Sequence, residues 1–266
     1  MARLQDKRLF LLDMDGTIYL DDRLFDGVTA FLARIRERGG RYLFLTNNSS
    51  RGVEDYIKKL AGMGIDAGRE DFLTSVDAAI DHLQRLYPGR RCYVQGTRSF
   101  YDQLAAAGID VTCDREGGAD ILLSGFDREL TFRKLEDACI LLGRGVTWLA
   151  TNPDWVCPTW YGSVPDCGSV CEMLTRATGR RPEFLGKPKP AMAELALRRT
   201  GYPAEAAAVI GDRIYTDIAC AVNAGIDSIF VLSGEGTRED IETYGIRPTW
   251  VYDDINAVFR AWEDEL

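Results

Sequence analysis

The sequence predicts an α/β fold built on parallel β-sheet, and two observations support this. Short runs of apolar residues, such as Leu9–Leu12, Tyr42–Leu45 and Ala207–Ile210, are typical of strands buried on both faces. Between these runs lie segments with apolar residues at helical spacing, such as Val28–Ile35, which Gly39 can close. Strands that alternate with helices imply parallel sheets joined by right-handed crossovers.

The other elements follow the same alternation along the chain. Further strands are expected at 72–74, 92–94, 121–123, 146–150, 229–232 and 250–252, and helices at 51–63, 75–87, 97–107, 131–142, 168–177, after 190, at 214–225 and at the end of the chain. Breaks at Pro88–Arg91 and Gly179–Pro182 set off a middle α/β series. We place its boundaries near residues 79 and 181. Residues 152–162, rich in proline and aromatic side chains, are expected to form a loop.

Composition and charge exclude several classes of protein. The 266 residues are 46% hydrophobic and 27% charged, which is enough apolar material for a sizeable core in one or two domains. A net charge of −9 argues against a nucleic-acid partner, which would require a basic face. His82 is the single histidine and lies in a helical pattern with no nucleophile motif beside it. Acid–base chemistry therefore falls to carboxylates.

Cysteine usage and hydropathy indicate a cytoplasmic protein. The chain has seven cysteines, and no pair has Cys-x-x-Cys spacing. We therefore expect reduced thiols and no zinc site. The first residues lack the apolar stretch of a signal peptide, and no apolar run is long enough to span a membrane. We therefore expect no membrane partner.

Two carboxylates follow the first apolar strand directly. Asp13 and Asp15 stand at its carboxyl end, where open α/β sheets bind their ligands. Two carboxylates this close repel each other unless one stays protonated or a hard cation such as Mg²⁺ lies between them. Alternatively, Asp15, Gly16 and Thr17 simply form a turn, because Asp and Gly favour turns.

Polar residues also follow two other predicted strands. Thr46 and the amides of the next few residues suit an anion, although they would equally cap the following helix. Asp212 and Asp217 follow a later strand, and Lys187 lies in a proline-rich loop. Each of these alone would be an ordinary cap or a solvated charge. Together, carboxylates, a hydroxyl, amides and one lysine at one sheet edge predict a site for a dication and a phosphoryl group.

The motifs in this order resemble those of the haloacid dehalogenase-like hydrolases. The resemblance is carried by Asp13-Met14-Asp15-Gly16-Thr17, by Thr46, by Lys187, and by Gly211-Asp212 through Asp217. Three further segments resemble the NagD-like, para-nitrophenylphosphatase branch (subclass IIA): Leu45 to Ser49, Ala150 to Asp154, and Gly186 to Pro188. The resemblance implies a Rossmannoid core of residues 1–78 and 181–266 with an α/β cap of residues 79–180 inserted.

The resemblance also implies a role for each matching residue. Asp13 would be the nucleophile that forms an aspartyl-phosphate, and Asp15 the general acid and then the base. Mg²⁺ would be held by the Asp13 carboxylate, the Asp15 backbone carbonyl and the Asp212 carboxylate. Thr46, the Asn47 amide and Lys187 would hold the phosphoryl oxygens. Asp217 would orient Lys187 or a metal-bound water.

The expected function is a Mg²⁺-dependent phosphatase that hydrolyses small phosphate monoesters, such as sugar phosphates or nucleoside monophosphates. The alternative is a catalytically silent phosphate-binding or regulatory protein on the same fold. Asn48, Asn152 and Asp154 are candidate substrate-binding residues. Trp155, Trp160 and Tyr161 could stack on a substrate or belong to the cap core. A homodimer through the cap is plausible in this branch.

Overall fold

The computed structural model describes residues 3–159 and 161–264, which form two compact units. The first unit holds the chain up to Thr46, then Val53–Leu73, and the chain from Lys187 onward. The second holds Asn47–Gly52 and Thr74–Gly186, so residues 79–180 lie inside it. Among the described residues, no helix combines the length and hydrophobicity of a membrane span.

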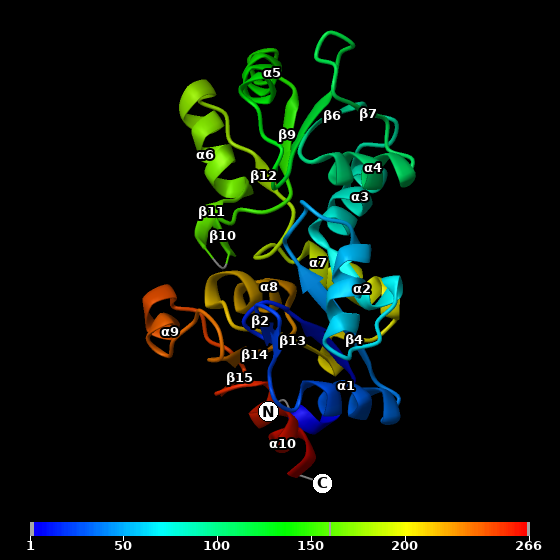
Figure 1. The fold of residues 1–266 in the computed structure, drawn as a ribbon, viewed down its shortest axis with the longest axis vertical. Coiled ribbons are helices and arrows are strands. Elements are labelled where there is room, and N and C mark those ends of the chain that lie inside the picture. Colours follow the sequence, from blue (N-terminus) through cyan, green and yellow to red (C-terminus); the bar gives the residue numbers. More distant parts are fainter. Residues whose placement is uncertain (1–2, 160, 265–266) are drawn as a thin grey trace. The chain divides into compact units, whose positions relative to one another are not determined.

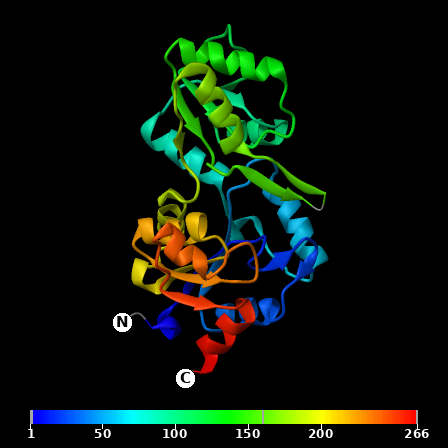
Figure 2. The same cartoon turned by 90° about the vertical axis from the view of Figure 1, so that its left-hand side faces the viewer.

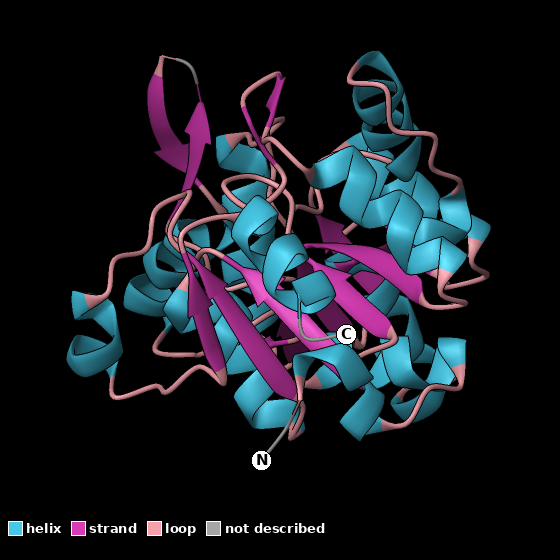
Figure 3. Ribbon diagram, turned by 90° about the horizontal axis from the view of Figure 1, so that it is seen from below, coloured by secondary structure: helices cyan, strands magenta, loops and turns pink. Residues whose placement is uncertain are grey.

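A six-stranded sheet forms the centre of the first unit (Figure 1). Its strand order is β15 (Trp250–Tyr252), β14 (Asp227–Val231), β13 (Ala207–Gly211), β1 (Leu9–Leu12), β4 (Arg41–Thr46) and β5 (Phe72–Thr74). β1 pairs in parallel with both β13 and β4, and Leu12 lies opposite Ile210 on one side and Phe44 on the other. All four residues of β1 are buried because helices lie on both sides of the sheet (Figure 3). The predicted parallel α/β fold is confirmed.

Helices and short elements complete the first unit. The helices are α1 (Val28–Glu37), α2 (Val53–Gly62), α7 (Ala191–Thr200), α8 (Ala219–Ala224), α9 (Glu239–Tyr244) and α10 (Ile255–Asp264). The short elements are η1 (Leu4–Asp6), η2 (Arg69–Asp71), η3 (Ala204–Ala206), η4 (Ile214–Ile218) and the hairpin of β2 (Tyr19–Leu20) and β3 (Arg23–Leu24). Phe10, Phe31 and Trp262 pack edge to face in the core, with ring centroids 5.1–5.6 Å apart.

The second unit is a smaller α/β layer with its own parallel sheet. The strand order is β12 (Glu183–Phe184), β9 (Thr147–Ala150), β8 (Ile121–Ser124), β6 (Cys92–Gln95) and β7 (Val111–Thr112). Its helices are α3 (Ser75–Leu86), α4 (Arg98–Ala106), α5 (Phe132–Gly143) and α6 (Cys167–Thr178). Leu122, Leu142, Trp148 and Leu174 belong to its buried core.

One local prediction was wrong. The segment expected to be a loop at 152–162 contributes β10 (Val156–Thr159), which pairs antiparallel with β11 (Gly162–Pro165), visible as a green hairpin in Figure 2. Pro158 can lie in this strand because the hairpin is a two-stranded sheet with free outer edges. The helix expected from 214 to 225 is present and ends before Gly225, but its first turn is the π-helical η4, which leads into α8. Such widened turns occur preferentially at functional sites.

Candidate functional site

Three adjacent strands of the first unit end at residues that the sequence singled out. Asp13 follows β1, Thr46 is the last residue of β4, and Asp212 follows β13. Because β13, β1 and β4 are neighbours and run in parallel, their carboxyl ends share one edge of the sheet. The continuous apolar strands therefore deliver polar side chains to one place, where an open α/β sheet binds its ligands.

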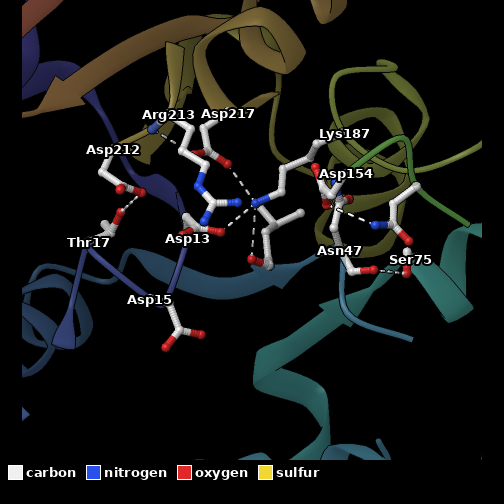
Figure 4. A network of polar contacts seen from close by, with 12 residues as sticks. Asp13, Asp15, Thr17, Asn47, Ser75, Asp154, Lys187, Asp212, Arg213 and Asp217 are labelled. Carbon is white, nitrogen blue, oxygen red and sulfur yellow. Dashed lines mark hydrogen bonds and ion pairs between the residues drawn. The ribbon is translucent and has the colours of Figure 1, made fainter. Parts of the chain in front are cut away.

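Lys187 lies at the centre of the charged groups at this edge. Its Nζ is 2.5 Å from Asp13 Oδ1 and 2.6 Å from Asp217 Oδ1, and it donates to the Leu45 carbonyl at 3.4 Å (Figure 4). Lys187 is only 3% exposed. Burial alone would lower the pKa of this ammonium group, but Asp13 and Asp217 together raise it. Lys187 is therefore a fixed positive charge beside Asp13.

Three carboxylates gather around this lysine. Asp13, Asp212 and Asp217 each offer one oxygen, and these oxygens all lie within 4.8 Å of one another. Burial and the neighbouring Asp217 raise the pKa of Asp13, and the same two causes raise the pKa of Asp212 to about 6. When ionised, three carboxylates carry more negative charge than the single ammonium group of Lys187 neutralises. A set of carboxylate oxygens with excess negative charge fits a hard dication such as Mg²⁺.

Glycines allow the chain to close around Asp212. Gly16 has a φ of +84°, which favours glycine, and a Cβ at this position would overlap the Asp212 carboxylate. A Cβ on Gly234 would overlap the same carboxylate. The Glu235 amide donates to Asp212 Oδ2 at 2.7 Å, and the Thr17 hydroxyl donates to Oδ1 at 3.4 Å. The Glu235 backbone amide and the Thr17 hydroxyl therefore fix the two oxygens of the Asp212 carboxylate.

Arg213 is a charged group near this cluster for which no role was predicted. Burial alone would lower the pKa of its guanidinium group, but Glu235, Asp13 and Asp212 raise it. Its Nε lies 2.9 Å from Glu235 Oε2. The Arg213 backbone amide donates to Asp217 Oδ2 at 3.1 Å, which fixes the second oxygen of that carboxylate. The Asp-Arg dipeptide carried no signal of its own, because an arginine after a strand is ordinarily solvated.

Asp15 lies to one side of the Lys187 network (Figure 4). Its side chain is 67% exposed, and it is not a member of the carboxylate cluster formed by the described residues. Its pKa is raised because protein atoms displace water from part of the carboxyl group, while Lys59 and Tyr19 act in the opposite direction. An open carboxyl group with a raised pKa can carry a proton to a bound molecule.

The remaining predicted site residues make contacts within the second unit. Asn47 Nδ2 and Asn152 Nδ2 both donate to Asp154 Oδ2, each at 2.9 Å, and the Ser75 hydroxyl donates to the Asn47 carbonyl at 2.7 Å. Asn48 Oδ1 accepts hydrogen bonds from the amide and hydroxyl of Ser50. The side chains proposed for substrate binding are thus engaged with neighbouring protein groups.

Of the aromatic residues proposed for stacking, Trp155 directly precedes β10 and Tyr161 lies in the turn between β10 and β11. Trp155 and Tyr161 are both exposed, and Trp160 lies outside the described residues. Exposed aromatic rings are available to a ligand, whereas a role in the core is excluded for these two.

The Asp212 shift predicts how the stability of the metal-free protein depends on pH. The pKa rises from 3.8 to about 6 on folding, so the folded state holds this proton more tightly than the unfolded state. The resulting stabilisation is present below pH ~4 and is lost as the pH rises through 6, a loss of roughly 3 kcal/mol. Urea unfolding from pH 4 to 7 should show a steeper loss of stability in the unsubstituted protein than in Asp212→Asn, where the raised pKa of Asp13 still contributes. The same slope in both proteins would contradict the assignment, and exposed Asp22→Asn is the matched control.

Comparisons with known proteins point to one family. A family model described as haloacid dehalogenase-like hydrolase matches residues 10–110, and a HAD-hydrolase-like model matches residues 184–258. An acid sugar phosphatase from Staphylococcus aureus is 32% identical over 98% of this chain and 100% of its own length.

Solved structures agree with these matches. A 4-nitrophenylphosphatase from Thermotoga maritima is 39% identical, with a TM-score of 0.92 over 98% of this chain and 99% of its own. A glycerol phosphate phosphatase from Mycobacterium tuberculosis, solved in complex with magnesium, is 32% identical, with a TM-score of 0.90 over 97% of this chain and 78% of its own.

Proposed function

Because the chain belongs to the haloacid dehalogenase-like hydrolases, in their NagD-like para-nitrophenylphosphatase branch, we propose that it is a Mg²⁺-dependent phosphatase of small phosphate monoesters. The observation that carries the proposal is the arrangement around Asp13. A carboxylate at a strand end, 2.5 Å from a buried lysine and grouped with two further carboxylates, suits attack on an anionic phosphoryl group.

The reaction proceeds in two displacements. In the first, an Asp13 carboxylate oxygen attacks phosphorus, and the bond from phosphorus to the leaving oxygen breaks. The electron pair stays on the leaving oxygen, which takes a proton from the Asp15 carboxyl group and departs as an alcohol. In the second, water attacks phosphorus and gives its proton to Asp15. The bond from phosphorus to Asp13 breaks, which restores both side chains and releases inorganic phosphate.

The neighbouring groups bind and orient the phosphoryl group. Lys187, the Thr46 hydroxyl and the Asn47 backbone amide hold its oxygens. The charge of the lysine and the hydrogen bonds from the other two groups stabilise the negative charge that develops in the transition state. Asp217 keeps Lys187 in place through its 2.6 Å contact. The carboxylates of Asp13 and Asp212, with the Asp15 backbone carbonyl, would hold Mg²⁺ beside Asp217. When bound, the ion supplies positive charge that offsets the repulsion between Asp13 and the phosphate.

The relatives suggest the class of substrate. They are named as an acid sugar phosphatase, a 4-nitrophenylphosphatase and a glycerol phosphate phosphatase. For this chain we propose small phosphorylated metabolites, with sugar phosphates and nucleoside monophosphates among them. Residues 79–180 act as the cap that selects the substrate, and Asn48, Asn152 and Asp154 stay candidates for contacts with it.

Two further features remain proposals. One is a homodimer through the cap, which size-exclusion chromatography with light scattering would test. We also propose a cytoplasmic location, because seven cysteines without Cys-x-x-Cys spacing are typical of proteins from a reducing compartment.

Release of inorganic phosphate tests the proposed function. Purified protein with Mg²⁺ should hydrolyse 4-nitrophenyl phosphate and members of a sugar phosphate and nucleotide panel. Treatment with a chelator should abolish this activity, and added Mg²⁺ should restore it. The competing function, a silent phosphate-binding protein, predicts saturable binding of phosphate without turnover. Turnover that survives complete removal of metal would contradict the Mg²⁺-dependent mechanism.

A further inference from the structure

A separate set of contacts surrounds Asp15. Lys59, on α2, places its Nζ 3.8 Å from Asp15 Oδ1. The Tyr19 hydroxyl donates to Asp15 Oδ2 at 3.4 Å, a long hydrogen bond. Lys59 Nζ also lies 3.9 Å from the centroid of the Tyr19 ring. Each of the three side chains therefore contacts the other two, and all three belong to the first unit.

Tyr19 is the most firmly held of these three side chains. Its side chain is fully buried in the core, and its carbonyl accepts a hydrogen bond of 2.8 Å from the Gly16 amide. The backbone thus returns to Asp15 immediately after the turn at Gly16 and Thr17. A rigid aromatic face attracts the Lys59 ammonium group, and burial of its methylene stem restricts the lysine further. Lys59 is only 27% exposed at its side chain.

Asp15 is the most exposed of these three side chains. Two thirds of its side-chain surface is exposed, so little packing restrains the rotation of its carboxyl group. The contact from Lys59 and the contact from Tyr19 reach different oxygens of the same carboxyl group. These two contacts restrain the direction in which the group can deliver a proton.

We propose that Lys59 is a positioning residue for proton transfer by Asp15. It holds the carboxyl group in the orientation from which the proton passes to the leaving oxygen as the bond from phosphorus to that oxygen breaks. The carboxylate left on Asp15 is then paired with the Lys59 ammonium group. This inference rests on the proposed phosphatase function, and it adds a residue that none of the sequence motifs contains.

The leaving group distinguishes positioning from a general structural role. An alkoxide is a poor leaving group and depends on protonation, whereas 4-nitrophenolate departs readily without a proton. The ratio kcat/KM reports the steps up to departure of the leaving group, so the later hydrolysis of phosphorylated Asp13 does not enter it. Loss of a well-positioned acid should therefore lower kcat/KM selectively for alkyl phosphates. A structural defect would lower kcat/KM for both kinds of substrate equally.

The experiment compares Lys59→Met, Lys59→Arg and Lys58→Met. Lys58 is the neighbouring exposed lysine on α2 and provides the matched control. Each protein is assayed with 4-nitrophenyl phosphate and with a primary alkyl phosphate whose alcohol is uncharged, and its melting temperature is recorded. For Lys59→Met we expect kcat/KM to fall about 10- to 100-fold with the alkyl phosphate and less than about 3-fold with 4-nitrophenyl phosphate. Lys59→Arg should recover most of the loss, and Lys58→Met should behave as the unsubstituted protein.

Equal losses with both substrates, or no loss with either, would overturn the role of Lys59. Either result leaves the proposed function standing, because the unsubstituted protein turns over both substrates in the same assay. If the unsubstituted protein cleaves neither, the proposed function itself fails. A third substrate, an alkyl phosphate whose alcohol carries a carboxylate, tests whether Lys59 instead binds the leaving group. A loss confined to that substrate would show that Lys59 binds the leaving group directly, and would also overturn positioning.

Discussion

Phosphate release is expected to fall by a factor on the order of 10⁴ or more when Asp13 is replaced by asparagine. The amide is close in size to the carboxylate but lacks the negative oxygen that attacks phosphorus. The substitution also removes the charge that Lys187 Nζ contacts at 2.5 Å. Burial and Asp217 already disfavour the negative charge at this position, so Asp13→Asn should fold as well as the unsubstituted protein. The measurement is steady-state release of inorganic phosphate with saturating Mg²⁺ and 4-nitrophenyl phosphate.

Two further variants keep this result interpretable. Asp13→Ala excludes residual activity from slow deamidation of the asparagine, and Asp22→Asn makes the same chemical change at an exposed position in the turn between β2 and β3. Asp22→Asn should retain full activity. If a folded Asp13→Asn protein keeps more than a few per cent of the activity, Asp13 is not the nucleophile.

Replacing Lys187 by methionine should have the second largest effect, on activity and on stability together. Removal of the ammonium group leaves Asp13, Asp212 and Asp217 facing one another without their central positive charge. Breaking a buried ion pair from one side costs about 3–5 kcal/mol, so the metal-free variant should unfold at a much lower urea concentration at pH 7. The loss of a phosphate-binding charge should also lower kcat/KM by roughly 10²- to 10³-fold.

Mg²⁺ separates the two effects of this substitution. Since a ligand that binds only the folded state stabilises it, Mg²⁺ should raise the unfolding midpoint of Lys187→Met at least as much as that of the unsubstituted protein. Activity should not return, because the ion does not take the place of the ammonium group on the phosphoryl oxygens. Lys189→Met, an exposed lysine in the same loop, is the control. A metal-free Lys187→Met protein as stable as the control would contradict the charge balance described for this cluster.

The sequence predicted the core of the fold because that signal is local. Continuous apolar runs such as β1, β4 and β13 can be buried only when helices cover both faces of a sheet, so the parallel α/β arrangement follows from them. The carboxyl ends of these strands then bring Asp13, Thr46 and Asp212 to one edge. Asp217, in the helical turn η4 after β13, was expected beside them, whereas Asp15 was expected in the same group and lies outside the cluster of the described residues.

Contacts made by hydroxyl and amide side chains far apart in the sequence could not be predicted. Residues 47–52 follow core strand β4, yet they belong to the second unit. Ser49 Oγ lies 3.1 Å from Thr151 Oγ1 and accepts from the Phe126 amide at 2.9 Å. These hydroxyls look like ordinary helix caps in the sequence, because nothing local reveals the partner strand that they meet.

The position of Lys59 and the β10–β11 hairpin also could not be predicted from local sequence. On an amphipathic helix such as α2 a lysine is expected in solvent, and only the return of the chain at Tyr19 brings it to Asp15. The hairpin was expected to be a loop because residues 152–162 are rich in proline and aromatic side chains. Pairing between β10 and β11 overrides that weak local preference.

Chemical trapping of the phosphorylated enzyme tests the central claim, that Asp13 carries the phosphoryl group during turnover. Protein mixed with Mg²⁺ and excess substrate is quenched in acid within the first turnovers, and the quenched protein is reduced with borohydride. Because borohydride converts an aspartyl-phosphate to homoserine, mass spectrometry of the peptides identifies the residue that was phosphorylated. Homoserine at position 13, and none in Asp13→Asn, is the predicted result. Homoserine at any other position, or none at all in an enzyme whose rate is limited by release of phosphate from the intermediate, would contradict it.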